Sequence, residues 1–409
     1  MTEKHESIIN EEGALRVHKL TFWEAVMIIV GANIGSGILG LAYASRLAGW
    51  PILFLWLIVT GFLVTASMLY VAETTLRTKE NYQLPGLALK YVGSLGSWLV
   101  FFSVVANSVG CMIAYMAGSG NILSEMLGIS NQLGSILFAI PAVIVVWLGL
   151  KATGVAEKFI STGMMILLAL IIFASFLSKK ADLSSAMYTN WTYSVPVFNV
   201  ALFCYIAQYT VPELSRGLRH NPKKLAPAVS TGMFITFVLL SLVPLAVISL
   251  TGPEEVTEVA TLAWGRALGG WAFFTANIFA LCAMLTSYWA VGGSMLTNIV
   301  DKFKLKSEWD KKSRAIILAI IAIPPFILAY SEAVSFVDAI YLAGTFGGVI
   351  MSIIPVMMLR GSRKNGNKEP EWTAGWISHP AIQAILITIF CAAAIYSILS
   401  MLGFLPAGW

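Results

Sequence analysis

Apolar residues fill this chain in long runs, and short polar segments separate the runs at regular intervals. Each run holds about 20 apolar residues, the length of α-helix that crosses the hydrocarbon core of a bilayer. Turn-forming and charged residues gather between them, as in "RTKENYQLPG" and "DKFKLKSEWDKKSR". The pattern predicts an all-α integral membrane protein with eleven transmembrane helices, at residues 20–45, 50–75, 95–122, 132–150, 156–178, 194–214, 225–251, 267–298, 314–330, 334–359 and 379–403.

The basic residues test this count, because Lys and Arg concentrate in the cytoplasmic segments of membrane proteins. With a cytoplasmic N-terminus, 22 of the 26 Lys and Arg residues fall on the inside. The exceptions are Arg46, Lys179, Lys180 and Arg266. Residues 1–19 have mixed charges and no signal-peptide pattern, so we interpret them as a retained cytoplasmic tail. We predict a multi-pass protein of the cytoplasmic membrane, with an extracellular C-terminus.

The composition excludes an ordinary soluble domain, since 58% of the residues are hydrophobic and 11% are charged. The inside loops account for the net charge of +5, so we expect contact with the lipid bilayer and no nucleic-acid partner. The 4 Cys residues stand singly in apolar runs and the 4 His residues lie in tails or loops, which indicates no metal cluster or cofactor. No paired carboxylates or Ser–His arrangement lies at membrane depth, and no span carries a continuous polar stripe. An enzyme and a channel are therefore both disfavoured.

The order of the spans suggests an internal repeat. Because five spans separate the start of the first from the start of the sixth, these two enter the membrane from opposite sides. If residues 190–360 repeat the five helices of residues 20–180, the repeats are inverted, and residues 361–409 add a loop and an eleventh helix. Inverted repeats place a substrate site at the bilayer midplane, where two discontinuous helices meet.

The first span contains the stretch "GANIGSGILG", which is poorly suited to a continuous helix. Gly31, Gly35 and Gly37 each cost about 1 kcal/mol relative to alanine in a helix interior, so local unwinding is favoured. Unwinding would free carbonyls below the break and N–H groups above it, which suit an ammonium and a carboxylate respectively. Close helix packing through small residues is the alternative explanation of these glycines.

The sixth span is polar for its depth, with Asn199, Tyr205, Gln208, Tyr209 and Thr210 in twelve residues. Pro212 removes a backbone donor and would free a carbonyl near Gln208. The residues alone fit a broken helix and a proline-kinked helix equally well.

Three stretches resemble a known group of transporters: "GANIGSGILGLAYASRLAGW", "ALFCYIAQYTVPELSRGL" and "LCAMLTSYWAVGGSMLTNIVDKF". They are similar to the amino acid/auxin permeases and the aromatic (Trp/Tyr) and hydroxy amino-acid permeases, in the amino acid/polyamine/organocation (APC) superfamily. The resemblance implies a LeuT-type fold, a 5+5 inverted repeat plus one extra helix, and secondary active transport of amino acids. One departure concerns the sixth span, where Ile206 and Ala207 replace the usual glycine, so its unwinding is less assured.

The resemblance also implies where the substrate binds. The carboxylate would lie against the N–H groups of the second half of the first span, and the ammonium against carbonyls of both breaks. The substrate-binding residues implied are Gly31, Ala32, Gly35, Ser36, Gly37, Asn107, Cys111, Phe203, Cys204, Tyr205 and Gln208, with Ser108, Phe336 and Gly344 as further candidates for side-chain selection.

The coupling ion is either Na⁺ or H⁺. In sodium-coupled relatives, adjacent hydroxyls such as Thr286 and Ser287 join carbonyls like those of Gly31 and Ile34 as ligands. Those hydroxyls could equally bond their own helix backbone. Some proton-coupled relatives carry a lysine in the fifth span, but Lys158 lies near its cytoplasmic end and Met164 stands at the expected position, which favours sodium.

Charged residues in the spans suggest a gate. Arg46 and Asp338 both lie near the outer face, where a pair would close the vestibule; snorkelling to the interface is the alternative. Solvated or capping roles are expected for Glu24, Glu73, Glu213 and Asp301 at the cytoplasmic span ends. We predict a monomeric, cation-coupled symporter of neutral amino acids, aromatic ones among the candidates. An uncoupled exchanger and a non-transporting sensor remain alternatives.

Overall fold

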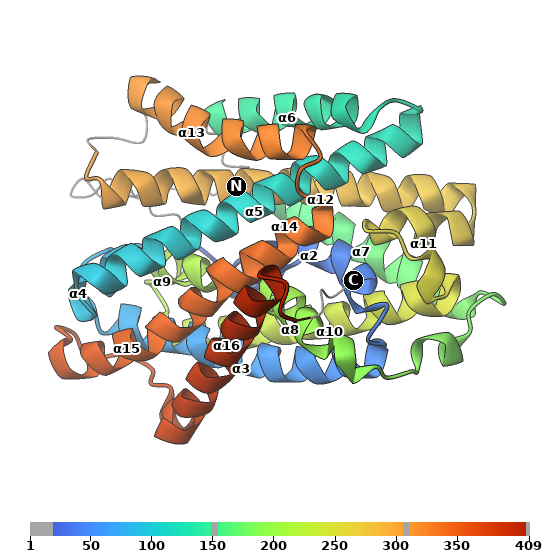
Figure 1. Ribbon diagram of the computed structural model, residues 1–409. Helices are drawn as coiled ribbons and strands as arrows, with labels where there is room; N and C mark the ends of the chain where they lie inside the picture. The colour runs from blue at the N-terminus through green and yellow to red at the C-terminus, as the bar shows by residue number, and fades with distance from the viewer. Residues whose placement is uncertain (1–18, 149–153, 306–310, 406–409) are drawn as a thin grey trace, which may run out of the picture.

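The computed structural model describes residues 19–148, 154–305 and 311–405 (Figure 1). Its regular elements in these ranges are helical, which confirms the all-α class. The helices are α1 (Phe22–Asn33), α2 (Ser36–Ser45), α3 (Trp50–Leu76), α4 (Leu84–Tyr91), α5 (Ser94–Leu127), α6 (Asn131–Leu148), α7 (Gly154–Leu177), α8 (Ser194–Phe203), α9 (Val211–Gly217), α10 (Leu225–Thr251), α11 (Ala260–Leu268), α12 (Gly270–Lys302), α13 (Lys311–Tyr330), α14 (Phe336–Leu342), α15 (Val349–Asn365) and α16 (Pro380–Met401).

Many of these helices are long and apolar enough to cross a membrane. Within the described ranges, eight helical segments meet that description, and the bent pair of α1 and α2 makes a ninth. Two shorter apolar helices, Asn131–Trp147 and Thr162–Leu177, flank the stretch 149–153 that lies outside the described residues. The chain is therefore a multi-pass membrane protein. The count of eleven, the domain boundaries and the orientation of the termini stay predictions.

The first span is broken where the glycines predicted it. Thr21 and Glu24 form a capping box that starts α1, so Glu24 has the capping role expected of it. The helix ends at Asn33, residues 34 and 35 leave helical geometry, and α2 continues at an angle of 45° to α1. The break lies in the middle of the span and not at its edge.

The sixth span is also broken, although Ile206 and Ala207 made that uncertain. α8 ends at Phe203, residues 204–207 are not helical, and a 3-10 turn at Gln208–Thr210 leads into α9. Pro212 does not interrupt a continuous helix, as a proline kink would. It occupies the first turn of α9, where the missing N–H group has no intrahelical partner to lose.

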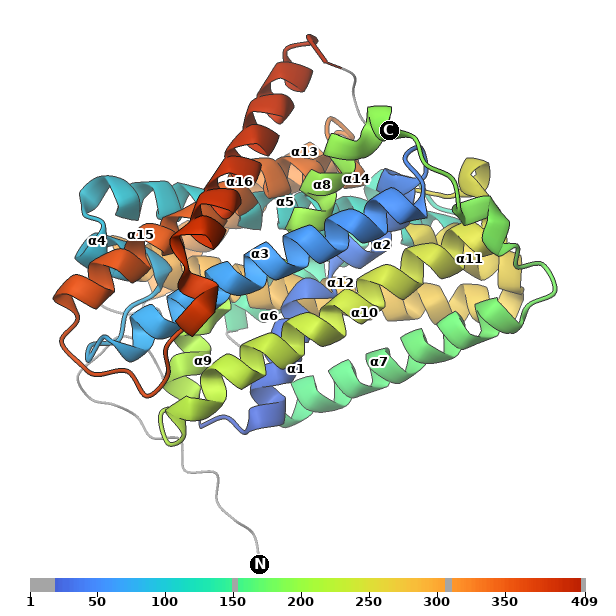
Figure 2. The same ribbon diagram turned by 90° about the horizontal axis from the view of Figure 1, so that it is seen from below.

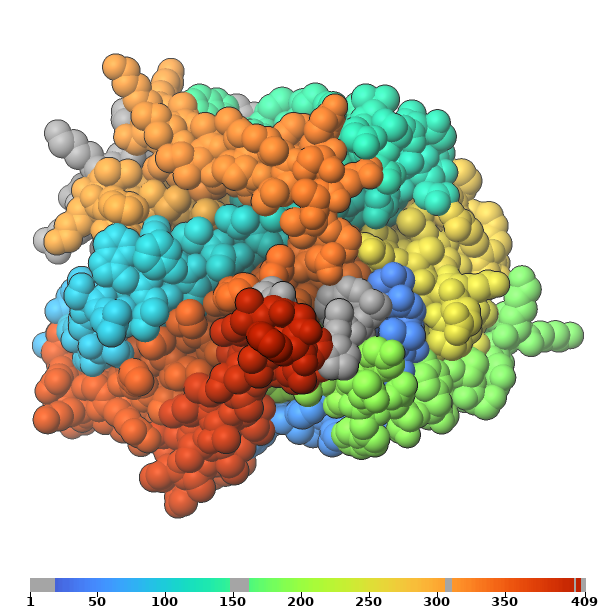
Figure 3. Space-filling view, in the orientation of Figure 1, coloured from blue at the N-terminus to red at the C-terminus, as the bar shows by residue number. Residues whose placement is uncertain are grey.

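The helices pack around α5 and α3 (Figure 2). α5 contacts α6, α12, α13 and α14, whereas α3 contacts α8, α10 and α15. Figure 3 shows α5 and α13 on one face of the molecule, and Figure 2 shows α16 projecting from the bundle. In the apolar 18-residue window of Pro380–Ser400 only 28% is buried, compared with 89% in that of Trp191–Gly217, so α16 packs less closely on the bundle.

Glu73 corrects one expectation. It is fully buried near the end of α3 and not solvated. Its carboxylate accepts two hydrogen bonds from Arg363 of α15, at 2.8 and 2.9 Å, and one each from Arg77 and the backbone N–H of Ala374. Arg363 also donates to Ser378, before α16. A single carboxylate thus joins α3, α15 and the loop that leads to α16.

Gly49 offers a stability test. It has φ +93°, and a Cβ atom there would lie 1.9 Å from the carbonyl oxygen of Tyr188. Gly269 has φ +109° but no atom within 4 Å of such a Cβ among the described residues. We expect Gly49→Ala to lower the free energy of unfolding by about 1–3 kcal/mol more than Gly269→Ala, because only the former adds a backbone clash to the strain. Unfolding in detergent measures both; equal losses would contradict the role of Tyr188.

Candidate substrate site

The two broken helices meet at their breaks. A Cβ atom added to Gly37 would lie 2.7 Å from Sγ and 3.3 Å from Cα of Cys204, and 3.3 Å from the ring of Phe203. The start of α2 therefore contacts the end of α8 directly. At Gly37, and also at Gly35, neighbouring atoms lie so close that a side chain larger than hydrogen would clash with them. Close packing and unwinding, which the sequence presented as alternatives, occur together here.

Unpaired donors face this junction. Gly35 caps α2 without any side-chain hydrogen bond to the helix end. The first N–H groups of a helix have no intrahelical partner, and the helix dipole makes them attractive to an anion. Ser36 is fully buried, and its Oγ has no partner among the described residues. A carboxylate would satisfy both kinds of donor.

Acceptors lie on the opposite side of each break. The last carbonyls of α1 have no following helical turn to supply N–H partners, and residues 204–206 lie between α8 and the next 3-10 turn. A Cβ atom at Gly31 would meet no described atom within 4 Å, so open space lies beside that backbone. Carbonyl oxygens around open space suit an ammonium group.

Tyr115 and Ser287 lie beside Gly35, and only Ser287 was predicted from the sequence. A Cβ atom at Gly35 would lie 2.9 Å from the hydroxyl of Tyr115 and 3.1 Å from Oγ of Ser287. Tyr115 was missed from the sequence, although it continues the face of Asn107 and Cys111 at a spacing of four residues. That spacing was the signal that could have found it. Asn107 and Cys111 are both buried on α5.

Several predicted residues contact helices other than α2. The ring of Tyr205 lies 3.1 Å from the Cβ position of Gly61 on α3, and Gln208 donates to Ser352 of α15 at 3.1 Å. Gly344, in the π-helix Ala343–Gly348, packs on Asn199 and Phe203. The remaining candidates are buried without a contact that assigns them a role: Ser108 on α5, and Phe336 beside Gly40 and Gly118.

The candidate sodium ligands differ in their contacts. Ser287 lies beside Gly35, as described above, whereas Thr286 donates to the carbonyls of Cys282 and Ala283 on its own helix. The carbonyls of Gly31 and Ile34 end α1 on the same side of the break. The side chain of Lys158 lies outside the described residues, and Met164 is half-buried.

The two proposed gate residues lie on different helices: Arg46 follows α2, and Asp338 lies in α14. The guanidinium of Arg46 lies 3.5 Å from the ring centre of Tyr43 and donates to the Tyr43 carbonyl at 3.0 Å. Asp338 lies in the first turn of α14, where its N–H group bonds Ser335. The ion pairs found between described residues do not include Arg46 with Asp338.

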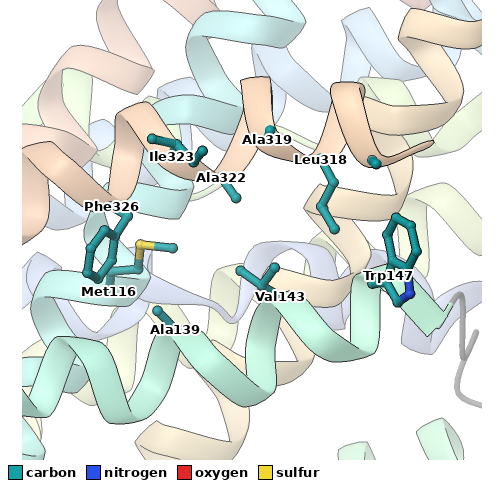
Figure 4. Close-up of a pocket in the computed structure, with 10 residues that line it drawn as sticks. Met116, Ala139, Val143, Trp147, Leu318, Ala319, Ala322, Ile323 and Phe326 are labelled. Atoms are coloured by element: carbon teal, nitrogen blue, oxygen red, sulfur yellow. The ribbon is translucent and has the colours of Figure 1, made fainter. Parts of the chain in front are cut away.

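A hollow lies between α6 and α13, and its lining is almost entirely apolar (Figure 4). It has a volume of about 330 Å³, and its walls include Met116, Val143, Leu318 and Phe326. A zwitterionic amino acid needs partners for two charged groups, and this lining offers none. The junction of the broken helices is therefore the better candidate for the substrate site.

Comparisons with known proteins identify the family of this chain. Residues 18–398 match the sequence model of the tryptophan/tyrosine permease family. The tryptophan-specific transport protein of Pseudomonas aeruginosa is 25% identical over 93% of this chain and 95% of its own length. That of Haemophilus influenzae is 25% identical over 83% and 87% respectively. The amino acid transporter ANT1 of Arabidopsis thaliana is 24% identical over 69% and 68%.

The fold comparison points the same way. The crystal structure of MhsT in complex with L-phenylalanine matches with a TM-score of 0.67 and 16% identity, covering 93% of this chain and all of that one. At this identity the match shows the LeuT-type fold and nothing about ligands. Since the family model spans almost the whole chain, this protein belongs to the tryptophan/tyrosine permease family, and it is an amino-acid transporter and not an enzyme.

Proposed function

We propose that the protein is a secondary active symporter that couples the entry of an aromatic amino acid to a cation gradient. The contact of Gly37, in the first turn of α2, with Cys204, which follows α8, carries this proposal, because it places the N-terminal end of α2 beside the second break. The transport of tryptophan by named relatives and the bound L-phenylalanine of MhsT support an aromatic substrate.

The recognition would divide the substrate into three parts. Its carboxylate binds at the start of α2, where Ser36 and the N–H groups lie, and its ammonium binds at the carbonyls of both breaks. Its ring then packs against Phe203 and the α5 face of Tyr115. The N-terminus is proposed to lie in the cytoplasm, as the distribution of basic residues indicates.

Sodium is the proposed coupling ion, and Ser287 provides the test. Hard cations prefer oxygen ligands, and of the two candidate hydroxyls on α12 only that of Ser287 lies beside Gly35 at the break. We expect Ser287→Ala to raise the sodium concentration for half-maximal uptake by about tenfold, the equivalent of about 1.4 kcal/mol. Thr297→Ala is the matched control, since Thr297 is a hydroxyl farther along α12 that bonds its own helix. Unchanged sodium dependence in Ser287→Ala would rule out this ligand.

Uptake into proteoliposomes tests the function itself. The full chain is reconstituted, and labelled tryptophan, tyrosine, phenylalanine, leucine and lysine are offered under an inward sodium gradient. A second series uses a pH gradient without sodium, and a third uses internal unlabelled substrate without any gradient. Sodium-driven accumulation of the aromatic substrates supports the proposal. Uptake with the pH gradient alone indicates proton coupling, counterflow alone indicates an exchanger, and no flux in any series contradicts transport.

A further inference from the structure

A polar cavity of about 300 Å³ lies at the predicted cytoplasmic end, away from the junction of the broken helices. Figure 1 shows α4, α9 and one end of α15 gathered at that end of the bundle. The cavity lies between the segment after α3, α9 and the loop after α15. Four basic residues line it: Lys79, Arg216, Arg219 and Lys368.

Arg216 is the unusual member of this group. It is only 7% exposed, and its Nε atom has no hydrogen-bond partner among the described residues. Its Nη1 atom makes one long bond, 3.4 Å, to the carbonyl of Tyr82. Glu213 and Asp301 act on Arg216 at longer range, but no described carboxylate forms an ion pair with it. A buried guanidinium with open donors is costly, and an anion would relieve that cost.

The acidic residue in the wall does not neutralise these cations. Both oxygens of Glu80 are already engaged, by Lys90 at 2.5 Å and by Asn367 at 3.0 and 3.1 Å. Arg219 makes one hydrogen bond, to Asn81 at 2.6 Å, and a guanidinium offers five donors. Arg216 and Arg219 therefore keep donors available in the cavity.

We propose that this cavity binds a phosphate group, and that the group is the headgroup of an anionic phospholipid of the inner leaflet. Arginine donors match phosphate oxygens in geometry, and basic clusters just inside the membrane attract anionic lipids. Lys79 and Arg219 are exposed at the rim, so a headgroup can approach from the interface. A phosphate bound to both Arg216 and Lys79 joins α9, the inner half of the second broken span, to the end of α3.

Thermal unfolding of the full chain in neutral detergent tests this site without any need for transport. Mixed micelles of phosphatidylcholine are compared with micelles that contain phosphatidylglycerol, and a separate arm adds inorganic phosphate at constant ionic strength. We expect phosphatidylglycerol to raise the unfolding temperature. In Arg216→Gln and Arg219→Gln the apparent affinity for that lipid should fall by at least about tenfold.

Two controls separate the site from general charge effects. Lys364→Gln removes an exposed cation of α15 that does not line the cavity, and it should keep the full lipid effect. Arg219→Gln keeps the test valid if Arg216→Gln fails to fold, since Arg219 is exposed. If inorganic phosphate stabilises the protein but phosphatidylglycerol does not, and both arginine variants lose this effect, the cavity binds phosphate and its ligand is not a lipid.

The rival occupant is the acidic N-terminal segment, because the N–H group of Leu20 bonds the carbonyl of Gly217 beside Arg216. If Glu11 and Glu12 fill the cavity, neither phosphatidylglycerol nor phosphate stabilises the protein, and E11Q/E12Q lowers the unfolding temperature as much as Arg219→Gln does. That result overturns the proposal. So does a lipid effect of equal size in all variants.

Discussion

Gly37→Leu should abolish binding of the amino acid while the protein remains folded. Even one carbon at this position would lie 2.7 Å from Sγ of Cys204 and 3.3 Å from the ring of Phe203. The larger leucine side chain must occupy the space between the two breaks, where the substrate carboxylate is proposed to lie. We expect the dissociation constant to rise at least about 100-fold, which corresponds to about 2.7 kcal/mol. Binding of labelled tryptophan to the purified protein measures this change.

The matched control is Gly293→Leu. Gly293 lies on the exposed side of α12, and a Cβ atom there would meet no described atom within 4 Å. This variant should bind normally and unfold at a temperature close to that of the wild-type protein, whereas Gly37→Leu should fold but unfold at a lower temperature, because Cys204 must move. Gly35→Leu should resemble Gly37→Leu, because its Cβ atom would lie 2.9 Å from the hydroxyl of Tyr115. Normal binding by Gly37→Leu would show that the carboxylate does not bind at this junction.

The two breaks differ in how far the sequence could reveal them. The first was predictable, because glycine lowers helix stability wherever it stands and three of them occur within seven residues. The second was not, since Ile206 and Ala207 carry no such local signal. Packing supplies the reason: Ile206 contacts the Cβ position of Gly348, and Tyr205 that of Gly61, so neighbouring helices hold the unwound segment. Tertiary contacts of this kind cannot be read from one span.

The hydrogen-bond partners of polar side chains could not be predicted from the sequence either. Gln208 and Asn33 are polar residues near the two breaks, but Gln208 donates to Ser352 at 3.1 Å and Asn33 donates to Thr236 at 3.4 Å. Each partner lies on a helix far away in sequence. Arg46 and Asp338, by contrast, bond residues of their own helix ends, Tyr43 and Ser335 respectively. A sequence shows the depth of a side chain in the membrane, whereas the rotation of each helix, which decides its partner, depends on the whole bundle.

Among these long-range contacts, we expect those of Glu73 to contribute most to stability. From the sequence a solvated or capping role was expected, yet Glu73 is fully buried and accepts bonds from Arg363, Arg77 and Ala374. We expect Glu73→Ala to lower the free energy of unfolding by about 3–5 kcal/mol, because it leaves two guanidinium groups without their shared partner. Glu73→Gln should lose somewhat less, since the amide oxygen can still accept one bond.

A surface pair provides the comparison. Glu125 pairs with Arg266, and both side chains are nearly half exposed, so Glu125→Gln should cost less than about 1 kcal/mol. Unfolding in detergent measures all three variants, and proteolysis of the loop between α15 and α16 reports where the change acts. Since Glu73 bonds Ala374 in that loop, only the Glu73 variants should expose it to cleavage. If Glu73→Ala unfolds like Glu125→Gln and its loop stays protected, the buried carboxylate does not hold α16 to the bundle, and the packing of α16 on α15 must do so instead.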